Sequence, residues 1–151
     1  MMEDQKYEAV KLKNQLCFPL YAASRETIRL YKPYLDELDL TYTQYISMMV
    51  LWEKKSVTVK ELGRELYLDS GTLTPLLKKL EAKGLLTRKR STEDERNLIV
   101  SITEQGESLK DKAVEIHDSM AACVRLTPEE SLTMYRLLYK LLSYVDDERG
   151  E

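Results

Sequence analysis

The strongest constraint on the fold lies in the middle of the chain, where two short helical segments are followed at once by two short strands. The first helical segment opens at Thr58-Val-Lys-Glu61, which has the pattern of a capping box, and the second runs from Gly71 to Lys83. The four residues between them, Tyr67 to Ser70, have the length of a tight turn. Two short helices, a tight turn and a β-hairpin together predict a winged helix-turn-helix.

The helix predicted from Gly71 to Lys83 has one apolar side and a defined end. Its leucines recur every three or four residues and should face the core: Leu73, Leu76, Leu77 and Leu80. Gly84 follows as a stop signal. Pro75 is tolerated in a first helical turn, which leaves the start uncertain by about two residues. Three residues near that start are candidate caps: Asp69, Ser70 and Thr72.

The predicted hairpin consists of residues 85–90 and 97–103, joined by the charged loop Ser91-Thr-Glu-Asp-Glu-Arg96. The second strand places Leu98, Val100 and Ile102 on one face. This hairpin is the wing of the predicted fold.

Helices are predicted on both sides of this unit. An amphipathic pattern from about Lys6 to Tyr31 predicts a helix in which Pro19 causes a kink or break beside Cys17, and Pro33 should end the region. Thr41 to Glu53 predicts a largely buried second helix. After the hairpin, one long helix is expected from Thr103 to Cys123, and a last one starts at Thr127-Pro128.

Length and composition favour one mainly α domain with a small β-hairpin. The chain has 151 residues, 43% of them hydrophobic, and few glycines and prolines. We assign residues 1–151 to a single domain, with about 41–103 as the winged helix-turn-helix. The flanking parts, about 6–35 and 104–148, should be dimerisation helices, because Leu132 to Val145 carries more apolar surface than the small core needs.

Charge is concentrated in one element of the chain. The net charge is -3, but Thr72 to Thr92 holds six basic residues against the single acid Glu81, which leaves -8 for the rest. A basic element on an acidic body favours a polyanionic partner such as DNA.

The second helix and the hairpin provide the predicted DNA contacts. Small polar residues at the start of the helix can meet phosphates and base edges, and cations further along can meet phosphates. The assigned residues are Ser70, Gly71, Thr72, Thr74, Pro75, Lys78, Lys79, Arg88, Arg90, Asp94 and Arg96. The alternative is a protein-binding module with solvated lysines, but the cluster Arg88, Lys89, Arg90 and Arg96 has more cations than solubility needs.

No segment predicts a membrane span or a signal peptide, so a cytoplasmic protein is expected. Two cysteines, Cys17 and Cys123, match no metal-ligand spacing, and the single His117 cannot build a metal site. We therefore expect neither a metal nor a cofactor. Taken alone, Cys17 beside Leu16 and Phe18 fits a buried structural cysteine.

Several of these runs resemble a known family. The segment from Tyr67 to Glu81, the following Gly84-Leu-Leu-Thr-Arg-Lys-Arg-Ser91 and Asp94-Glu-Arg96 closely resemble MarR-family repressors of the organic hydroperoxide resistance subgroup. Asn14-Gln-Leu-Cys17-Phe belongs to the same likeness, which covers nearly the whole chain.

This resemblance implies a homodimeric repressor that binds a pseudo-palindromic operator when reduced. It implies that Cys17 is the thiol oxidised by an organic hydroperoxide and that Tyr31 and Tyr42 hydrogen-bond to it, partly across the dimer. It implies that Asp94 orients Arg96 into the minor groove. A second cysteine near Cys123 is typical of members that close a disulfide between subunits, although Cys123 can also be an inert helix residue.

Two other functions stay open on the residues alone. Cys17 and Cys123 could be the peroxidatic and resolving residues of a thiol peroxidase. The many tyrosines could instead line a pocket for a phenolic ligand that relieves repression.

Overall fold

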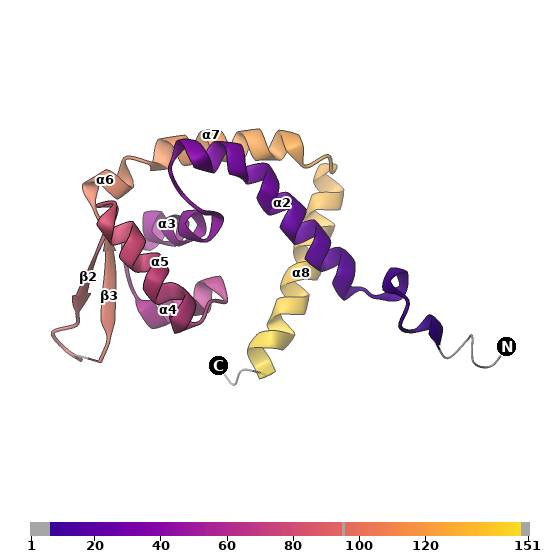
Figure 1. Cartoon of the computed structure of the whole chain (residues 1–151), viewed down its shortest axis with the longest axis horizontal. Coiled ribbons are helices and arrows are strands. Elements are labelled where there is room, and N and C mark those ends of the chain that lie inside the picture. Colours follow the sequence, from indigo (N-terminus) through magenta and orange to yellow (C-terminus); the bar gives the residue numbers. More distant parts are fainter. Residues whose placement is uncertain (1–6, 95, 149–151) are drawn as a thin grey trace. The chain divides into compact units, whose positions relative to one another are not determined.

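The computed structural model describes residues 7–94 and 96–148 (Figure 1). This part of the chain is mainly helical with a small three-stranded sheet, which confirms the predicted fold class. The elements follow the order η1 (Leu12–Asn14, a 3-10 helix), α2 (Cys17–Glu37), α3 (Tyr42–Lys54), β1 (Ser56–Thr58), α4 (Val59–Leu66), α5 (Ser70–Ala82), β2 (Leu86–Arg90), β3 (Leu98–Ile102), α6 (Glu104–Glu107), α7 (Lys110–Cys123) and α8 (Pro128–Glu148).

The contacts divide the chain into two units, residues 1–117 and residues 118–151. In the first unit, α3, α4, α5 and the sheet enclose one apolar core. Its fully buried side chains come from all of these elements: Met48, Leu51, Leu62, Leu73, Leu77, Leu80, Leu86 and Val100. The indole nitrogen of Trp52 donates a hydrogen bond of 2.9 Å to the carbonyl of Gly106, so the polar atom of this buried ring has a partner.

Helices α4 and α5 form the helix-turn-helix, and the predicted caps are present. Thr58 and Glu61 make the expected capping box at the start of α4. Asp69 caps α5 by accepting from the amide of Thr72. The turn requires a glycine at position 63, because a Cβ there would lie 2.7 Å from the carbonyl oxygen of Leu68.

Helix α5 ends as predicted at Gly84. This residue has φ of 73°, a left-handed conformation that glycine adopts without strain. Its amide donates to the carbonyl of Glu81, and the amide of Leu85 donates to that of Leu80. This pair of bonds is a Schellman motif, and it leads the chain directly into β2.

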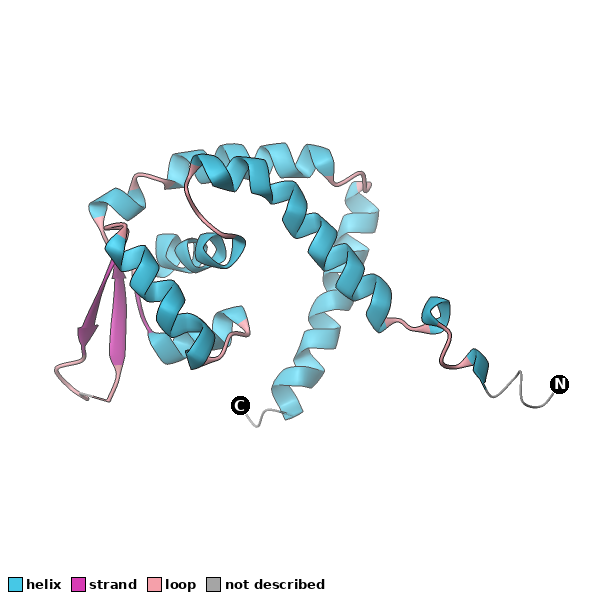
Figure 2. Ribbon diagram, in the orientation of Figure 1, coloured by secondary structure: helices cyan, strands magenta, loops and turns pink. Residues whose placement is uncertain are grey.

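The sheet has the order β1-β3-β2, all antiparallel (Figure 2). The two wing strands agree with the prediction to within one residue, and Arg88 lies opposite Val100 in the register. Strand β1 was not predicted. Its three residues, Ser56–Thr58, are too few to show an alternating pattern, and they become a strand only because β3 offers its second edge.

The two predictions about proline in the N-terminal region have different outcomes. The break predicted beside Cys17 is present, because η1 ends at Asn14 and α2 begins at Cys17, with Pro19 as its third residue. A proline in the first turn is tolerated, since the first amides of a helix need no carbonyl partner. The predicted start at Lys6 lies outside the described residues. The prediction for Pro33 is wrong, because α2 continues through it to Glu37. The burial of Leu35 and Leu38 beyond the proline offsets the hydrogen bond that Pro33 cannot donate.

The single helix predicted from Thr103 to Cys123 is also interrupted. Thr103 caps a short helix, α6, by accepting from the amide of Gly106, and α7 begins only at Lys110. Gly106 packs closely against the chain that enters the wing, since a Cβ there would lie 2.1 Å from the carbonyl oxygen of Leu85. Helix α6 therefore lies directly against the start of the wing.

The second unit contains the end of α7 and the helix α8. Helix α8 starts at Pro128 after Thr127, as predicted, and Thr127 and Glu130 form a reciprocal cap there. The apolar residues of α8 are exposed: Leu132, Met134, Tyr135, Leu137, Leu138, Tyr139, Leu141, Tyr144 and Val145. Among the residues that the structure describes, no helix has the length and apolar character of a membrane span.

Candidate functional site

Helix α5 presents one polar face opposite the leucines that anchor it. All seven residues of this helix that were predicted to contact DNA are exposed: Ser70, Gly71, Thr72, Thr74, Pro75, Lys78 and Lys79. Pro75 is the sixth residue of the helix, beyond the first turn in which we expected it. The exposed face keeps its polar and basic character along the helix.

The hydroxyl groups of Thr72 and Thr74 on this face each donate a hydrogen bond within the protein. The hydroxyl of Thr72 donates to Asp69 at 3.0 Å, and that of Thr74 donates to the carbonyl of Ser70 at 2.8 Å. The bonds from Thr72 lower the pKa of the Asp69 carboxyl, because they favour its ionised form. Each hydroxyl oxygen can still accept a hydrogen bond, so this end of α5 is suited to amino groups on base edges.

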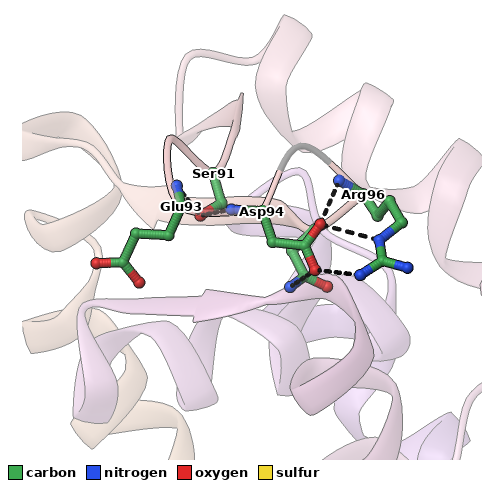
Figure 3. Close-up of polar contacts among 5 residues, drawn as sticks. Ser91, Glu93, Asp94 and Arg96 are labelled. Carbon is green, nitrogen blue, oxygen red and sulfur yellow. Dashed lines mark hydrogen bonds and ion pairs between the residues drawn. The ribbon is translucent and has the colours of Figure 1, made fainter.

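The tip of the wing is held by Asp94 (Figure 3). Its carboxylate accepts from the amide of Arg96 at 3.1 Å and from the guanidinium at 3.0 and 3.2 Å. These bonds lower the pKa of Asp94. The Arg96 side chain is 90% exposed, so the carboxylate fixes its direction while leaving the rest of the guanidinium accessible.

Ser91 and Asn97 complete the turn. The Ser91 hydroxyl accepts from the amides of Glu93 and Asp94, and the amide of Ser91 donates to the carbonyl of Asn97 at 2.8 Å. The structure thus brings Asp94 and Arg96 together as the resemblance implied. The roles of Ser91 and Asn97 were not predicted, although serine and asparagine are common in tight turns.

Arg88 has a different environment from the one we expected. Its guanidinium donates to Glu81 at 3.0 and 2.7 Å, and its amide donates to the same carboxylate at 3.0 Å. Only 19% of the Arg88 side chain is exposed. Arg88 therefore connects β2 to α5, whereas Lys89 and Arg90 are exposed on the same strand.

Cys17 and the two tyrosines occupy different parts of the first unit. Cys17 is the exposed first residue of α2, which argues against a buried structural cysteine. Tyr31 lies on the same helix, and its ring meets that of Tyr42 edge-on, with centroids 5.1 Å apart. The helical rise separates Cys17 from Tyr31 by about 21 Å. Within one chain, the thiol and Tyr31 therefore cannot be in contact.

The tyrosine pair belongs to a larger aromatic cluster. Tyr45 lies 6.0 Å from Tyr31 and 6.0 Å from Trp52, measured between ring centroids. Burial raises the pKa of Tyr31, Tyr42 and Tyr45, so all three hydroxyls stay protonated at neutral pH. Tyr45 lies on the helix predicted from Thr41 to Glu53, but its place in this cluster was not predicted.

Cys123 ends α7 in the second unit and is also exposed. Across the described ranges, no group of three or more histidine, cysteine, aspartate or glutamate side chains could hold a metal ion. The chemistry available at these positions is therefore that of two accessible thiols and neutral tyrosine hydroxyls.

A family model described as transcriptional regulator SarA/Rot matches residues 29–113, which include the helix-turn-helix and the wing. The chain belongs to this family of transcriptional regulators. The regulator is 50% identical over 139 residues to the organic hydroperoxide resistance transcriptional regulator of Bacillus subtilis, an alignment that covers 92% of this chain and 95% of that protein. The resemblance to organic hydroperoxide regulators of the MarR family is thereby confirmed.

Solved structures give the same result. The regulator matches the reduced form of AbfR bound to DNA with a TM-score of 0.76 and 33% identity, over 94% of this chain and 99% of that one. It matches disulfide-formed AbfR with a TM-score of 0.63 and 34% identity, over 93% and 98%. AbfR is a protein of Staphylococcus epidermidis. The relatives are transcriptional regulators rather than enzymes, and they give no support to a thiol peroxidase.

Proposed function

We propose that the regulator is a homodimeric repressor that binds a pseudo-palindromic operator when reduced and releases it when an organic hydroperoxide oxidises Cys17. One observation is the main support for DNA binding. The polar face of α5 and Arg96, which Asp94 orients, are both exposed on the same winged helix. A regulator of this kind acts on chromosomal DNA, so the cytoplasm is its expected location.

The DNA-binding surface has the parts that two-groove recognition needs. A recognition helix lies in the major groove, while a wing arginine suits the negative potential of a narrow minor groove. Ser70, Thr74 and Lys78 follow one another at four-residue intervals on the exposed face of α5. This face can meet phosphates and base edges, and Arg96 can reach the neighbouring groove.

Exposed apolar surface supports the dimer. Near the start of α2, Leu16, Phe18 and Tyr21 are exposed, and so is the leucine- and tyrosine-rich surface of α8. Exposed apolar side chains gathered on a helix are typical of association surfaces. A two-fold dimer would place two copies of α5 in successive major grooves about 34–36 Å apart.

The separation of Cys17 from Tyr31 supports a sensor site shared between subunits. A hydroxyl can act on the thiol only if the tyrosine pair belongs to the other protomer, because about 21 Å separates the two positions along α2. In the proposed site, Cys17 of one subunit lies beside Tyr31 and Tyr42 of the partner. Their protonated hydroxyls donate to the sulfur and favour its ionised form.

The proposed reaction is a two-step oxidation. The Cys17 thiolate attacks one oxygen of the hydroperoxide, the O–O bond breaks, and the alkoxide leaves and takes a proton to become an alcohol. Cys17 is then a sulfenic acid. In the second step, the Cys123 thiol of the partner attacks this sulfur, forming a disulfide and releasing water. A disulfide needs the two Cα atoms within about 7 Å, so helix movement accompanies the reaction.

The DNA part is tested by band-shift titration with Arg96→Ala at fixed salt. Loss of a base-edge contact costs about 1 to 3 kcal/mol, so the affinity for the operator should fall roughly 5- to 150-fold without loss of folding. Lys112→Ala, which removes one exposed cation from α7, is the matched control. Equal affinities of the two variants would contradict the assignment of Arg96.

The redox part is tested with cumene hydroperoxide. Cys17→Ser should still bind operator DNA but not release it on oxidation, while Tyr31→Phe and Tyr42→Phe should release it more slowly than the wild type. Normal release by Cys17→Ser would place the sensor elsewhere.

The pairing of Cys17 with Cys123 is tested by non-reducing gel electrophoresis after one equivalent of cumene hydroperoxide. A covalent dimer should form and should be lost in both Cys17→Ser and Cys123→Ser. A monomer that carries only a sulfenic acid or a small-thiol adduct would leave Cys123 as a packing residue.

A pocket in the first unit favours a second candidate function. Its volume is about 470 Å³, and it is lined by Tyr31, Tyr45, Met49, Trp52, Glu53, Lys110, Ala113, Val114 and His117. An apolar pocket with a few polar groups at this size fits a small aromatic ligand. If the protein lacking both cysteines still left DNA on addition of salicylate, relief by a phenolic ligand would be favoured.

A further inference from the structure

Glu81 is the only acidic residue between Thr72 and Thr92, the segment that includes most of α5 and all of β2. An isolated carboxylate on a DNA-facing element repels phosphates, so it needs another role to offset that cost. Its position gives one. Glu81 lies in the last turn of α5, next to the glycine turn that leads into the wing.

Three hydrogen bonds connect Glu81 to Arg88. One carboxylate oxygen accepts from the backbone amide of Arg88, and the other accepts from two guanidinium nitrogens. The carboxylate therefore contacts both the backbone and the side chain of β2. Arg88 is largely buried in this contact, and charge-assisted bonds of this kind hold a defined geometry.

The pair joins the last turn of α5 to the middle of β2, so a small change in angle there is amplified at the tip of the wing. Arg88 is six residues before Asp94, and three residues of strand alone span about 10 Å. A tilt of about 15° over that length moves the tip by about 3 Å, the length of a hydrogen bond. The angle between α5 and β2 thus decides whether α5 and Arg96 reach their two grooves together.

We propose that Glu81 and Arg88 form a positioning pair that sets the angle between the recognition helix and the wing, and so determines the preference for operator over other DNA. The inference rests on the proposed DNA-binding function. Neither residue needs to touch a base. Their effect is on selectivity, because non-specific binding depends on phosphate contacts, which tolerate a displaced wing.

Removing the Glu81 charge should weaken operator binding without weakening non-specific binding. Glu81→Gln keeps an acceptor oxygen but releases the Arg88 guanidinium from its ion pair. The Arg88 guanidinium then has no ion-pair partner and can contact a DNA phosphate. One added phosphate contact makes the slope of log affinity against log salt concentration steeper by about 0.9. Loss of folding would weaken both kinds of binding together, so this pattern distinguishes positioning from general damage.

The experiment uses the full-length reduced protein and two duplexes of equal length. One is the sequence that the wild-type protein selects from random DNA, and the other is a scrambled version with the same base composition. For Glu81→Gln we expect operator affinity to fall at least fivefold, non-specific affinity to hold or rise, and their ratio to fall about tenfold. Arg88→Ala should lower the ratio similarly, without the steeper salt dependence.

Two further variants separate the pair from its individual charges. Arg88→Lys should give an intermediate ratio, because lysine cannot make the two guanidinium bonds. The exchange Glu81→Arg with Arg88→Glu should recover part of the ratio lost in each single variant. An unchanged ratio in Glu81→Gln would overturn the proposal. So would a loss in the exchange variant equal to the sum of the losses of Glu81→Arg and Arg88→Glu. If the wild-type protein selected no sequence, the DNA-binding function would fail first and this inference with it.

Discussion

Helices α5 and α8 are both rich in leucine at three- and four-residue spacing, but their environments differ. The four leucines of α5 that face the core are buried, whereas four of the five leucines of α8 are exposed. The core of the first unit is complete within one protomer. Exposed apolar side chains gathered on one helix are typical of an association surface, so we propose that α8 contributes to the dimer.

This difference in burial predicts different roles for the winged helix and for α8. The winged helix has a buried core of its own, and in the proposed dimer α8 would supply the surface that sets the spacing of two such units. Changes in α5 should therefore alter the stability of the protomer. Changes in α8 should instead alter the dissociation constant of the dimer.

The largest expected effect is on the stability of the first unit. Leu77 is 1% exposed, and Leu77→Ala should lower the free energy of unfolding by about 2 to 5 kcal/mol, because it leaves a cavity in a closely packed core. Urea unfolding followed by the fluorescence of Trp52, the one tryptophan of the chain, measures this change. The loss should not depend on protein concentration.

Leu132→Ala in α8 is the matched control, since it removes the same atoms from a side chain that is 68% exposed. At protein concentrations below the dimer dissociation constant, it should leave the Trp52 transition unchanged. Equal losses for the two variants would show that α8 belongs to the core of the same protomer and would break the comparison.

The second effect is on dimerisation. Leu132→Ala should weaken the dimer by about 1.5 to 3 kcal/mol, the value of burying a leucine side chain, because its apolar surface would no longer be covered by the partner. Sedimentation equilibrium measures the dissociation constant. Lys140→Ala, on the same helix, should have little effect. A dimer that tolerated Leu132→Ala unchanged would place the interface elsewhere.

Much of the winged helix could be predicted because its signals are local. The Thr58–Glu61 capping box, the turn before Ser70, Gly84 and the two wing strands each depend on residues close in sequence. The exposed residues of α5 follow from the same pattern, since the leucine stripe determines which side is left exposed.

The failures involve packing between distant residues. Pro33 does not end α2 because Leu35 and Leu38 are buried beyond it, and β1 exists because β3 offers an edge. Arg88 was expected on the DNA surface because its charge is visible in the sequence. Its partner is seven residues away across a turn, and sequence spacing does not show that contact.

A third, smaller effect concerns the caps of α4 and α8, which have the same residues in the same arrangement. Thr58→Ala should lower the stability of the first unit by about 1 kcal/mol, since an amide at the start of α4 loses its partner. Thr127→Ala should leave the Trp52 transition unchanged and instead weaken the dimer. Guanidinium unfolding measures the stability of the first unit, and sedimentation measures the dimer dissociation constant. If both variants changed the same quantities, the separate roles of the first unit and α8 would be contradicted.

The smallest expected effect is a pH dependence of the same two caps. Bonds from the amide and hydroxyl of Thr58 lower the pKa of Glu61, and those from Thr127 lower the pKa of Glu130. A carboxyl whose pKa is lower in the folded state stabilises that state at pH values above its unfolded pKa, about 4.3 for glutamate. This contribution is lost as the pH falls through the lowered value, so it should be constant from pH 7 to about 5.

Glu61→Gln isolates this contribution, because the amide oxygen of glutamine can still accept from Thr58 but does not titrate. The difference in unfolding free energy between wild type and Glu61→Gln, followed at Trp52, should be constant near neutral pH and shrink below about pH 4.3. Glu130→Gln should show no such change at Trp52, because its cap stabilises the other unit. A difference that grew on acidification would reverse the sign of the proposed contribution, and an equal effect of Glu130→Gln would show that the two units unfold as one.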